Sequence, residues 1–161
     1  MENIHAVYNS VFSYIDEIKI SPLSRAYTFS DSVYEVIPFC NSNLIAFESH
    51  ICRLKKSCDA LNLSLNMNKT SKEITDLISR SNLTNGYVYY QVSRGIDSIR
   101  SHMFDDSQPD IVAYLNTSQQ KRASMAIDLY SFFKNCNDAV KKEKKQLVQM
   151  FKKQDLVIKL L

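Results

Sequence analysis

The stretch SDSVYEVIPFCNSNLIAFESHICRLKKSCDALN, residues 30–62, passes from a strand pattern to a helix pattern. Residues 33–39 alternate and are rich in β-branched and aromatic side chains, which favours a strand. A turn at 41–43 and a returning strand at 44–47 predict a hairpin, in which Pro38 indicates an edge position or a bulge. Over about 49–62 apolar residues recur at steps of three and four, which predicts a helix with one apolar stripe: Ile51, Leu54, Cys58 and Leu61.

The residues before this stretch also carry strand signals. Residues 6–12 are apolar-rich and strand-prone around a turn at Asn9-Ser10, and 17–20 predict a second short strand. The segment 21–31 is expected to be irregular.

The residues after it predict one more helix and two more strands. The helix is expected to start at Thr70, because Glu73 follows three residues later, as in a capping box. Strands are expected at 87–93 and 111–115. The order of these elements predicts an α+β fold, with an antiparallel or mixed sheet and two helices on one face.

Length and composition limit the class of protein. The chain has 161 residues, 45% apolar and 23% charged, which suits one ordinary domain with its own core. It has no run of 18 apolar residues, so we expect no membrane-spanning helix. The N-terminus lacks the basic and apolar regions of a secretory signal, and the expected compartment is the cytoplasm.

Charge is unevenly distributed along the chain, and glycine is scarce. Residues 1–120 carry ten Lys/Arg and thirteen Asp/Glu, whereas 121–161 carry ten and four. We therefore expect a domain at 1–120 and a Lys-rich, helical tail at 121–161. The tail has no aromatic interleaving, so neither nucleic acid nor a membrane surface is an expected partner. Only Gly86 and Gly95 are glycines, and Asn and Ser are expected at many turn positions.

Cysteine spacing argues against a metal site. The four cysteines are Cys40, Cys52, Cys58 and Cys136, with no C-x-x-C pair and no histidine at ligand spacing. Without a secretory context, free buried thiols are the expected state, and no metal is predicted.

Four separated motifs stand in a fixed order: SRAYTFSDSVYEV at 24–36, ESHICRL at 48–54, NGYVYYQVSRGI at 85–96 and RSH at 100–102. Together they resemble the class IV pyridoxal-phosphate aminotransferases, and most closely the D-amino acid (D-alanine) aminotransferase branch. The resemblance covers roughly 7–120. It implies a small N-terminal α+β domain followed by a larger domain, with pyridoxal phosphate bound in active sites at the interface of a homodimer.

The resemblance assigns roles to four residues. Arg53 matches the arginine that binds the cofactor phosphate, a role that suits a permanently charged fork of donors. Tyr34 matches a tyrosine that lines the substrate pocket, and we expect it to share a cleft with Arg53. Arg100 and His102 match a pair that binds the substrate carboxylate across the dimer. Without the resemblance these residues would be a solvated helix arginine, a half-buried strand tyrosine and an exposed loop.

The sequence also departs from the family pattern F-G-D-G-V-Y-E. Ser30 and Ser32 occupy its two glycine positions, and Ala26 stands where another glycine is common. If those glycines supply a positive φ, each serine costs about 1–2 kcal/mol.

The lysine that forms the Schiff base has no clear counterpart. In the family this lysine lies in the context D-[IV]-K-[ST]. The stretch that resembles this context here is CNDAVK at 136–141, so the expected Schiff-base lysine is Lys141 or Lys142. The acid that partners the pyridine nitrogen and the phosphate loops belong to the family's large domain. We therefore expect 121–161 to be a truncated or divergent start of that domain.

Several functions follow from the resemblance. The first is a D-amino acid transaminase, which moves an amino group from a D-amino acid to a 2-oxo acid, with this chain by itself inactive. The alternatives are a non-catalytic remnant or interaction domain and, within the family, a branched-chain aminotransferase or an aminodeoxychorismate lyase. The expected partners are the small-molecule amino acid and 2-oxo acid, and either a second copy of the chain or a missing large-domain partner.

Overall fold

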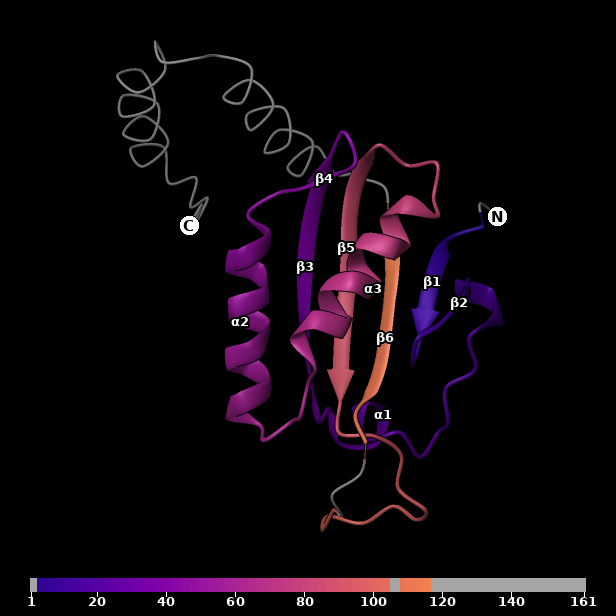
Figure 1. Cartoon of the computed structure of the whole chain (residues 1–161). Coiled ribbons are helices and arrows are strands. Elements are labelled where there is room, and N and C mark those ends of the chain that lie inside the picture. The colour runs from indigo at the N-terminus through magenta and orange to yellow at the C-terminus, as the bar shows by residue number, and fades with distance from the viewer. Residues whose placement is uncertain (1–2, 105–107, 117–161) are drawn as a thin grey trace, which may run out of the picture. The chain divides into compact units, whose positions relative to one another are not determined.

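Six strands form one antiparallel sheet, and two helices cover one of its faces in the computed structural model (Figure 1). The structure describes residues 3–104 and 108–116. The strand order is β2-β1-β6-β5-β3-β4. The elements are β1 (His5–Tyr8), β2 (Val11–Tyr14), the 3-10 helix η1 (Ile15–Glu17), α1 (Arg25–Phe29), β3 (Ser32–Cys40), β4 (Asn43–Leu44), α2 (Phe47–Ala60), α3 (Met67–Ser79), β5 (Asn85–Ser93) and β6 (Asp110–Asn116).

The sheet is built from pairs that are distant in sequence. β3 pairs with β5 along its whole length, from Ser32 opposite Ser93 to Cys40 opposite Asn85. β6 lies between β5 and β1. The predicted α+β fold, with an antiparallel sheet and two helices on one face, is confirmed.

Two local predictions before β3 are wrong. Residues 15–17 form the 3-10 helix η1, and no strand forms at 17–20. The segment expected to be irregular contains α1, a helix of five residues at one end of the sheet (Figure 1). A helix this short has no apolar period that a sequence pattern could show.

The hydrophobic core lies between the sheet and α2 and α3. The α2 stripe is confirmed, since Leu54 and Cys58 are buried and Ile51 and Leu61 pack against the core. The strands contribute alternate residues to the same layer, as expected of a sheet with one covered face. Its strand members include Val7, Ile37, Phe39, Val88, Tyr90, Val92, Ala113 and Leu115.

The helix α3 begins earlier than predicted. Its N-cap is Asn66, whose side-chain oxygen accepts a hydrogen bond from the Lys69 N–H at 3.0 Å. Thr70 and Glu73 therefore lie inside the helix and form no capping box. The buried hydroxyl of Tyr90 donates to the Glu73 carboxylate at 2.8 Å and lies 3.2 Å from the hydroxyl of Thr70.

Asn and Ser occupy most of the left-handed turn positions, as predicted. The described non-glycine residues with positive φ are Asn9, Ser10, Ser30, Asn41, Ser42, Ala46 and Asn62. Of the two serines at family glycine positions, Ser30 has φ 55° after α1, whereas Ser32 lies in the extended strand β3. The backbone strain expected for both serines therefore applies to Ser30 only.

Gly86 is required by a close approach inside the sheet. A Cβ at this position would collide with the carbonyl oxygen of Asn116 on β6 and would lie 3.0 Å from the Phe39 ring on β3. Glycine therefore lets β5 pass between its two neighbouring strands.

The cysteines only partly follow the prediction. Cys40 and Cys58 are buried, but Cys52 is exposed on α2. Burial raises the pKa of the Cys58 thiol to about 11. Cys136 lies outside the described residues.

The predicted tail and its boundary at residue 120 lie beyond the described part of the chain. Residues 3–104 and 108–116 belong to one compact unit. Within them, no helix is long and apolar enough to cross a membrane.

Candidate functional site

Arg53 is held by a buried carboxylate on the helix-covered side of the sheet. Its Nε donates to Glu35 Oε2 at 2.7 Å and its Nη2 donates to Glu35 Oε1 at 2.5 Å. The same Nη2 lies 3.1 Å from Nδ1 of His50. The Nη1 group has no hydrogen-bond partner among the described residues, and the Arg53 side chain is 60% exposed. One edge of the guanidinium is therefore fixed and the other is available to an anion.

The charge of Glu35 is set by competing effects. Burial by itself raises the pKa of this carboxyl, but hydrogen bonds from Arg53, His50 and the Val36 N–H outweigh it and hold the pKa below its usual range. The Glu35 carboxyl is therefore ionised near neutral pH and stays paired with Arg53. This pairing raises the pKa of Arg53, which remains a cation.

Tyr34 lies on the opposite, open face of the sheet. Its side chain is 63% exposed and its ring stacks on Tyr89, with centroids 5.3 Å apart. Tyr89 stacks in turn on Tyr114 at 5.0 Å, so three rings form a row across β3, β5 and β6. Burial raises the pKa of the Tyr89 and Tyr114 phenols.

Among the described residues Arg53 and Tyr34, which were expected to share a cleft, lie on opposite faces of the sheet. The reason is strand alternation, because neighbours such as Tyr34 and Glu35 point to opposite faces. Both side chains do flank the same sheet edge. In the described part of the chain no strand pairs with the outer edge of β3 before Phe39, since β4 reaches only Phe39 and Cys40.

Arg100 and His102 are brought together at the end of the sheet near α1. The Arg100 guanidinium carbon lies 4.6 Å from the centre of the Phe29 ring, and the His102 ring lies 5.2 Å from the same centre. Both residues are exposed. Arg100 forms no ion pair within the described ranges, so its charge is available to a carboxylate.

Beneath this pair lie charged residues that the sequence analysis missed. Arg25 and Arg94 are buried and both bind the carboxylate of Asp31, at 3.0 and 2.7 Å. Arg25 also binds Asp97 at 2.7 Å. Three of these four residues lie within motifs that carried the family resemblance, but a sequence pattern does not show that charges at 25–31 and at 94–97 meet in the fold.

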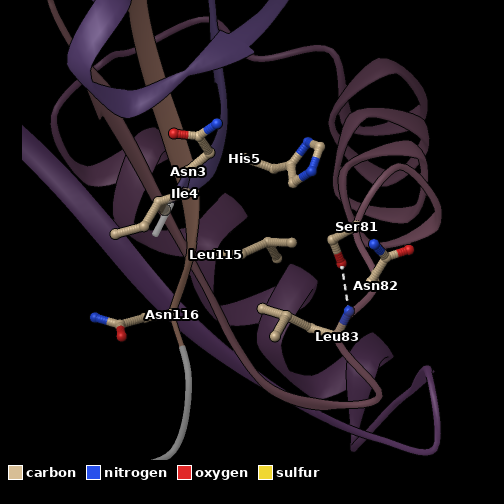
Figure 2. A pocket seen from close by; sticks show the side chains of 8 residues that line it. All are labelled: Asn3, Ile4, His5, Ser81, Asn82, Leu83, Leu115 and Asn116. Carbon is tan, nitrogen blue, oxygen red and sulfur yellow. Dashed lines mark hydrogen bonds between the residues drawn. The ribbon is translucent and has the colours of Figure 1, made fainter. Parts of the chain in front are cut away.

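One hollow in the described structure lies away from all four predicted residues. It has a volume of about 380 Å³ and lies where the start of β1, the residues after α3 and the end of β6 meet (Figure 2). It is lined by Asn3, Ile4, His5, Ser81, Asn82, Leu83, Leu115 and Asn116. Without an arginine or lysine among them, it is a poor match for a phosphate group.

Two further predictions can be placed against the structure. The described residues contain no group of three or more His, Cys, Asp or Glu side chains that could hold a metal ion. Lys141 and Lys142 lie outside the described residues.

Comparison with known proteins gives the family. Residues 32–152 match the model of the class IV amino-transferases, so the chain belongs to the class IV aminotransferase family. The resemblance drawn from the four motifs is thereby confirmed. Members of this family depend on pyridoxal phosphate and act on amino acids and 2-oxo acids.

Among individual relatives, D-alanine aminotransferases match part of the chain. The D-alanine aminotransferase of Listeria innocua is 36% identical over 87 residues, which are 53% of this chain and 30% of the relative. That of Staphylococcus epidermidis is 28% identical over 129 residues, 76% of this chain and 45% of the relative. The chain thus spans less than half the length of either enzyme.

A solved structure supports the fold. The branched-chain amino acid aminotransferase from Escherichia coli superposes with a TM-score of 0.65 at 17% identity. The match covers 72% of this chain and 41% of the other. At this identity the likeness concerns the fold alone, which is that of the N-terminal domain in this family.

Proposed function

We propose that this chain supplies the small-domain half of a D-amino acid transaminase site, in which Arg53 binds the phosphate of pyridoxal phosphate, while Arg100 and His102 bind the substrate carboxylate across a dimer, in the site of a second copy of the chain. The observation that carries the proposal is the state of the two arginines. Among the described residues Arg53 Nη1 has no hydrogen-bond partner and Arg100 forms no ion pair, whereas Arg25 and Arg94 are buried and paired. D-Alanine aminotransferases among the relatives support a D-amino acid as substrate.

The proposed phosphate contact fits the geometry of Arg53. A guanidinium has five N–H donors, and Glu35 and His50 face Nε and Nη2, which leaves Nη1 for a phosphate oxygen. The bound cofactor would supply an electron sink for the carbanion at the substrate's α-carbon. The residue that binds it covalently is proposed to be Lys141 or Lys142.

The proposed carboxylate contact uses charge and a ring. Arg100 offers a charge-assisted pair of donors, and His102 adds a third donor at the same ring of Phe29. Tyr34 is proposed as a pocket wall, on the opposite face of β3 from Arg53. A complete site then needs a partner that wraps the outer edge of β3, either a large domain or a second copy of this chain. The cytoplasm is the proposed compartment.

Cofactor binding is the direct test. Pyridoxal phosphate is titrated into the purified chain and followed by its absorbance, and borohydride reduction with peptide mapping then identifies the lysine bound. Arg53→Lys keeps the charge but loses the fork, so we expect about tenfold weaker binding. Lys56→Ala is the matched control, since it removes an exposed cation from the same helix and should bind like the wild type.

Substrate preference is read in the loaded protein. Addition of D-alanine should change the cofactor absorbance, and addition of L-alanine should not. A change with L-alanine alone would replace the proposal with the branched-chain or lyase alternatives.

One observation favours a second candidate, a non-catalytic interaction domain. Arg53 is already paired with a buried carboxylate, and Tyr34 lies on the other face of the sheet. A folded wild-type chain that gave no spectral change with pyridoxal phosphate would favour this candidate and exclude the enzyme.

A further inference from the structure

The segment that carries Arg100 and His102 is tied to the core by a buried arginine. Arg25 lies on α1 with its side chain 5% exposed. Its Nη1 donates to Asp97 Oδ2 at 2.7 Å and to the Ser101 carbonyl oxygen at 2.9 Å. One guanidinium nitrogen therefore holds the segment on both sides of Arg100.

Arg25 is itself held in place by residues at the ends of two strands of the sheet. Its Nε donates to Asp31 Oδ2 at 3.0 Å, and Arg94 donates to both oxygens of the same carboxylate at 2.7 and 3.2 Å. Arg94 also donates to the carbonyl oxygen of Leu61 at 2.8 Å. The backbone N–H of Arg25 donates to the Gly95 carbonyl oxygen at 2.9 Å, immediately before the segment.

Aromatic rings continue the same arrangement outward. The Phe29 ring lies 4.5 Å from the Arg25 guanidinium carbon and 4.6 Å from that of Arg100. Because His102 also lies against Phe29, one ring connects the buried arginine with both exposed residues. Phe104, at the end of the segment, lies 5.3 Å from Arg25.

Charge separates the roles of the three arginines. The carboxylates of Asp31 and Asp97 are bound by Arg25 and Arg94. Arg100 is exposed and forms no ion pair with a residue that the structure describes. The buried arginines thus order the segment, and the exposed arginine keeps its N–H groups for a ligand.

We infer that Arg25 is a positioning residue, which fixes residues 96–104 through Asp97 and Ser101 and so presents Arg100 and His102 as a preformed carboxylate-binding pair. The inference rests on the proposed function of that pair. A preformed pair binds an anion more tightly than a mobile one, because ordering is completed before binding.

Proteolysis tests the ordering. In the full chain, Asp97→Ala removes one partner of Arg25 and leaves Asp31 in place, so the fold should persist; Arg25→Lys is the second variant. We expect trypsin to cleave the Arg100–Ser101 bond about fivefold faster or more in both, since cleavage follows the population of the locally open state. Rates for Asp97→Ala are normalised to cleavage of a peptide of residues 94–104 with that substitution, and rates for the wild type and Arg25→Lys to cleavage of the unsubstituted peptide. Asp16→Ala, an exposed acid on η1, is the matched control.

Carboxylate affinity distinguishes positioning from a purely structural role. The imidazole signals of His102 are followed by NMR as D-alanine is added to the wild type, Arg100→Ala and Asp97→Ala. We expect half-saturation at about threefold higher concentration in Asp97→Ala than in the wild type, with the melting temperature little changed.

Each outcome has one reading. Faster cleavage together with weaker binding supports the inference. Unchanged cleavage overturns it, and so does faster cleavage with unchanged binding. If the wild type responds to D-alanine no more than Arg100→Ala does, the proposed function of the pair fails, and cleavage alone then decides whether Arg25 orders the segment.

Discussion

At Arg53 and Ser30 the fold determines the environment of a single residue. The Arg53 guanidinium has one edge on a buried carboxylate and one edge in solvent. Ser30 ends α1 in the left-handed region, where a side chain is strained and glycine is not. Ser32, two residues later, is extended.

This difference gives a prediction for two similar substitutions. Ser30→Gly should raise the free energy of unfolding by about 1 kcal/mol, because glycine relieves the positive φ. Ser32→Gly should lower it by about 0.5–1 kcal/mol, because glycine loosens a strand. Urea unfolding of both variants checks the pair. Equal effects of the two would show that the turn backbone does not distinguish these positions.

At the scale of elements, β5 connects the two halves of the sheet. It pairs with β3 on one side and β6 on the other, and a Cβ at Gly86 would meet atoms of both neighbours. The outer edge of β3 is protected differently. Pro38 has no N–H to expose, and the Val36 N–H donates to the Glu35 carboxylate at 3.0 Å. Both features limit pairing with another chain.

Gly86→Ala should therefore lower the stability of the sheet. The added methyl group meets the Asn116 carbonyl oxygen, and separating β5 from β6 should lower the free energy of unfolding by about 1–3 kcal/mol. Chemical denaturation measures the change. Ser64→Ala, at an exposed position outside the helices and strands, is the control, and a Gly86→Ala chain as stable as this control would contradict the close approach.

The elements also show what sequence reasoning reached. The strands at β3, β5 and β6 and the apolar stripe of α2 follow periods of two and of three to four residues, and these were predicted. α1 was missed because five residues are too few for a period. Glu73 was misassigned because its partner is not the helix start but Tyr90 on β5, a contact set by tertiary packing.

For the candidate site, too, the sequence predicted some features and missed others. Motif order gave the family and led to the proposed site residues Tyr34, Arg53, Arg100 and His102. It did not show that Tyr34 and Arg53 lie on opposite faces of β3, although alternation along VYEV implies that Tyr34 and Glu35 diverge. The contacts of Arg25 with Asp31 and Asp97 link residues up to 72 positions apart and have no one-dimensional signature.

At the scale of the whole molecule, the part-buried carboxyl of Asp31 and the buried carboxyl of Glu35 link stability to pH. Burial raises the pKa of Asp31, but hydrogen bonds from Arg94 and Arg25 outweigh it and leave the pKa below its usual value. Glu35 behaves in the same way with Arg53 and His50. In the unfolded chain both groups return to ordinary pKa values near 4.

The sign of the pH dependence follows. A group whose pKa is lower in the folded state stabilises the fold above its unfolded pKa, and this contribution is lost as the pH falls towards the folded pKa. We expect the free energy of unfolding, measured in urea, to be steady from pH 7 to about 5 and to fall steeply below about 4. Glu35→Gln should fall less steeply, and an equal slope in that variant would exclude Glu35 as a source.

The row of Tyr34, Tyr89 and Tyr114 gives the molecule a built-in optical reporter. The chain has nine tyrosines and no tryptophan, so its near-ultraviolet circular dichroism and intrinsic emission are dominated by phenol rings. Three of those rings are stacked in contact on the open face, where their transitions couple. Binding of another protein or domain over this face should therefore change the near-ultraviolet circular dichroism and the emission of the unlabelled protein.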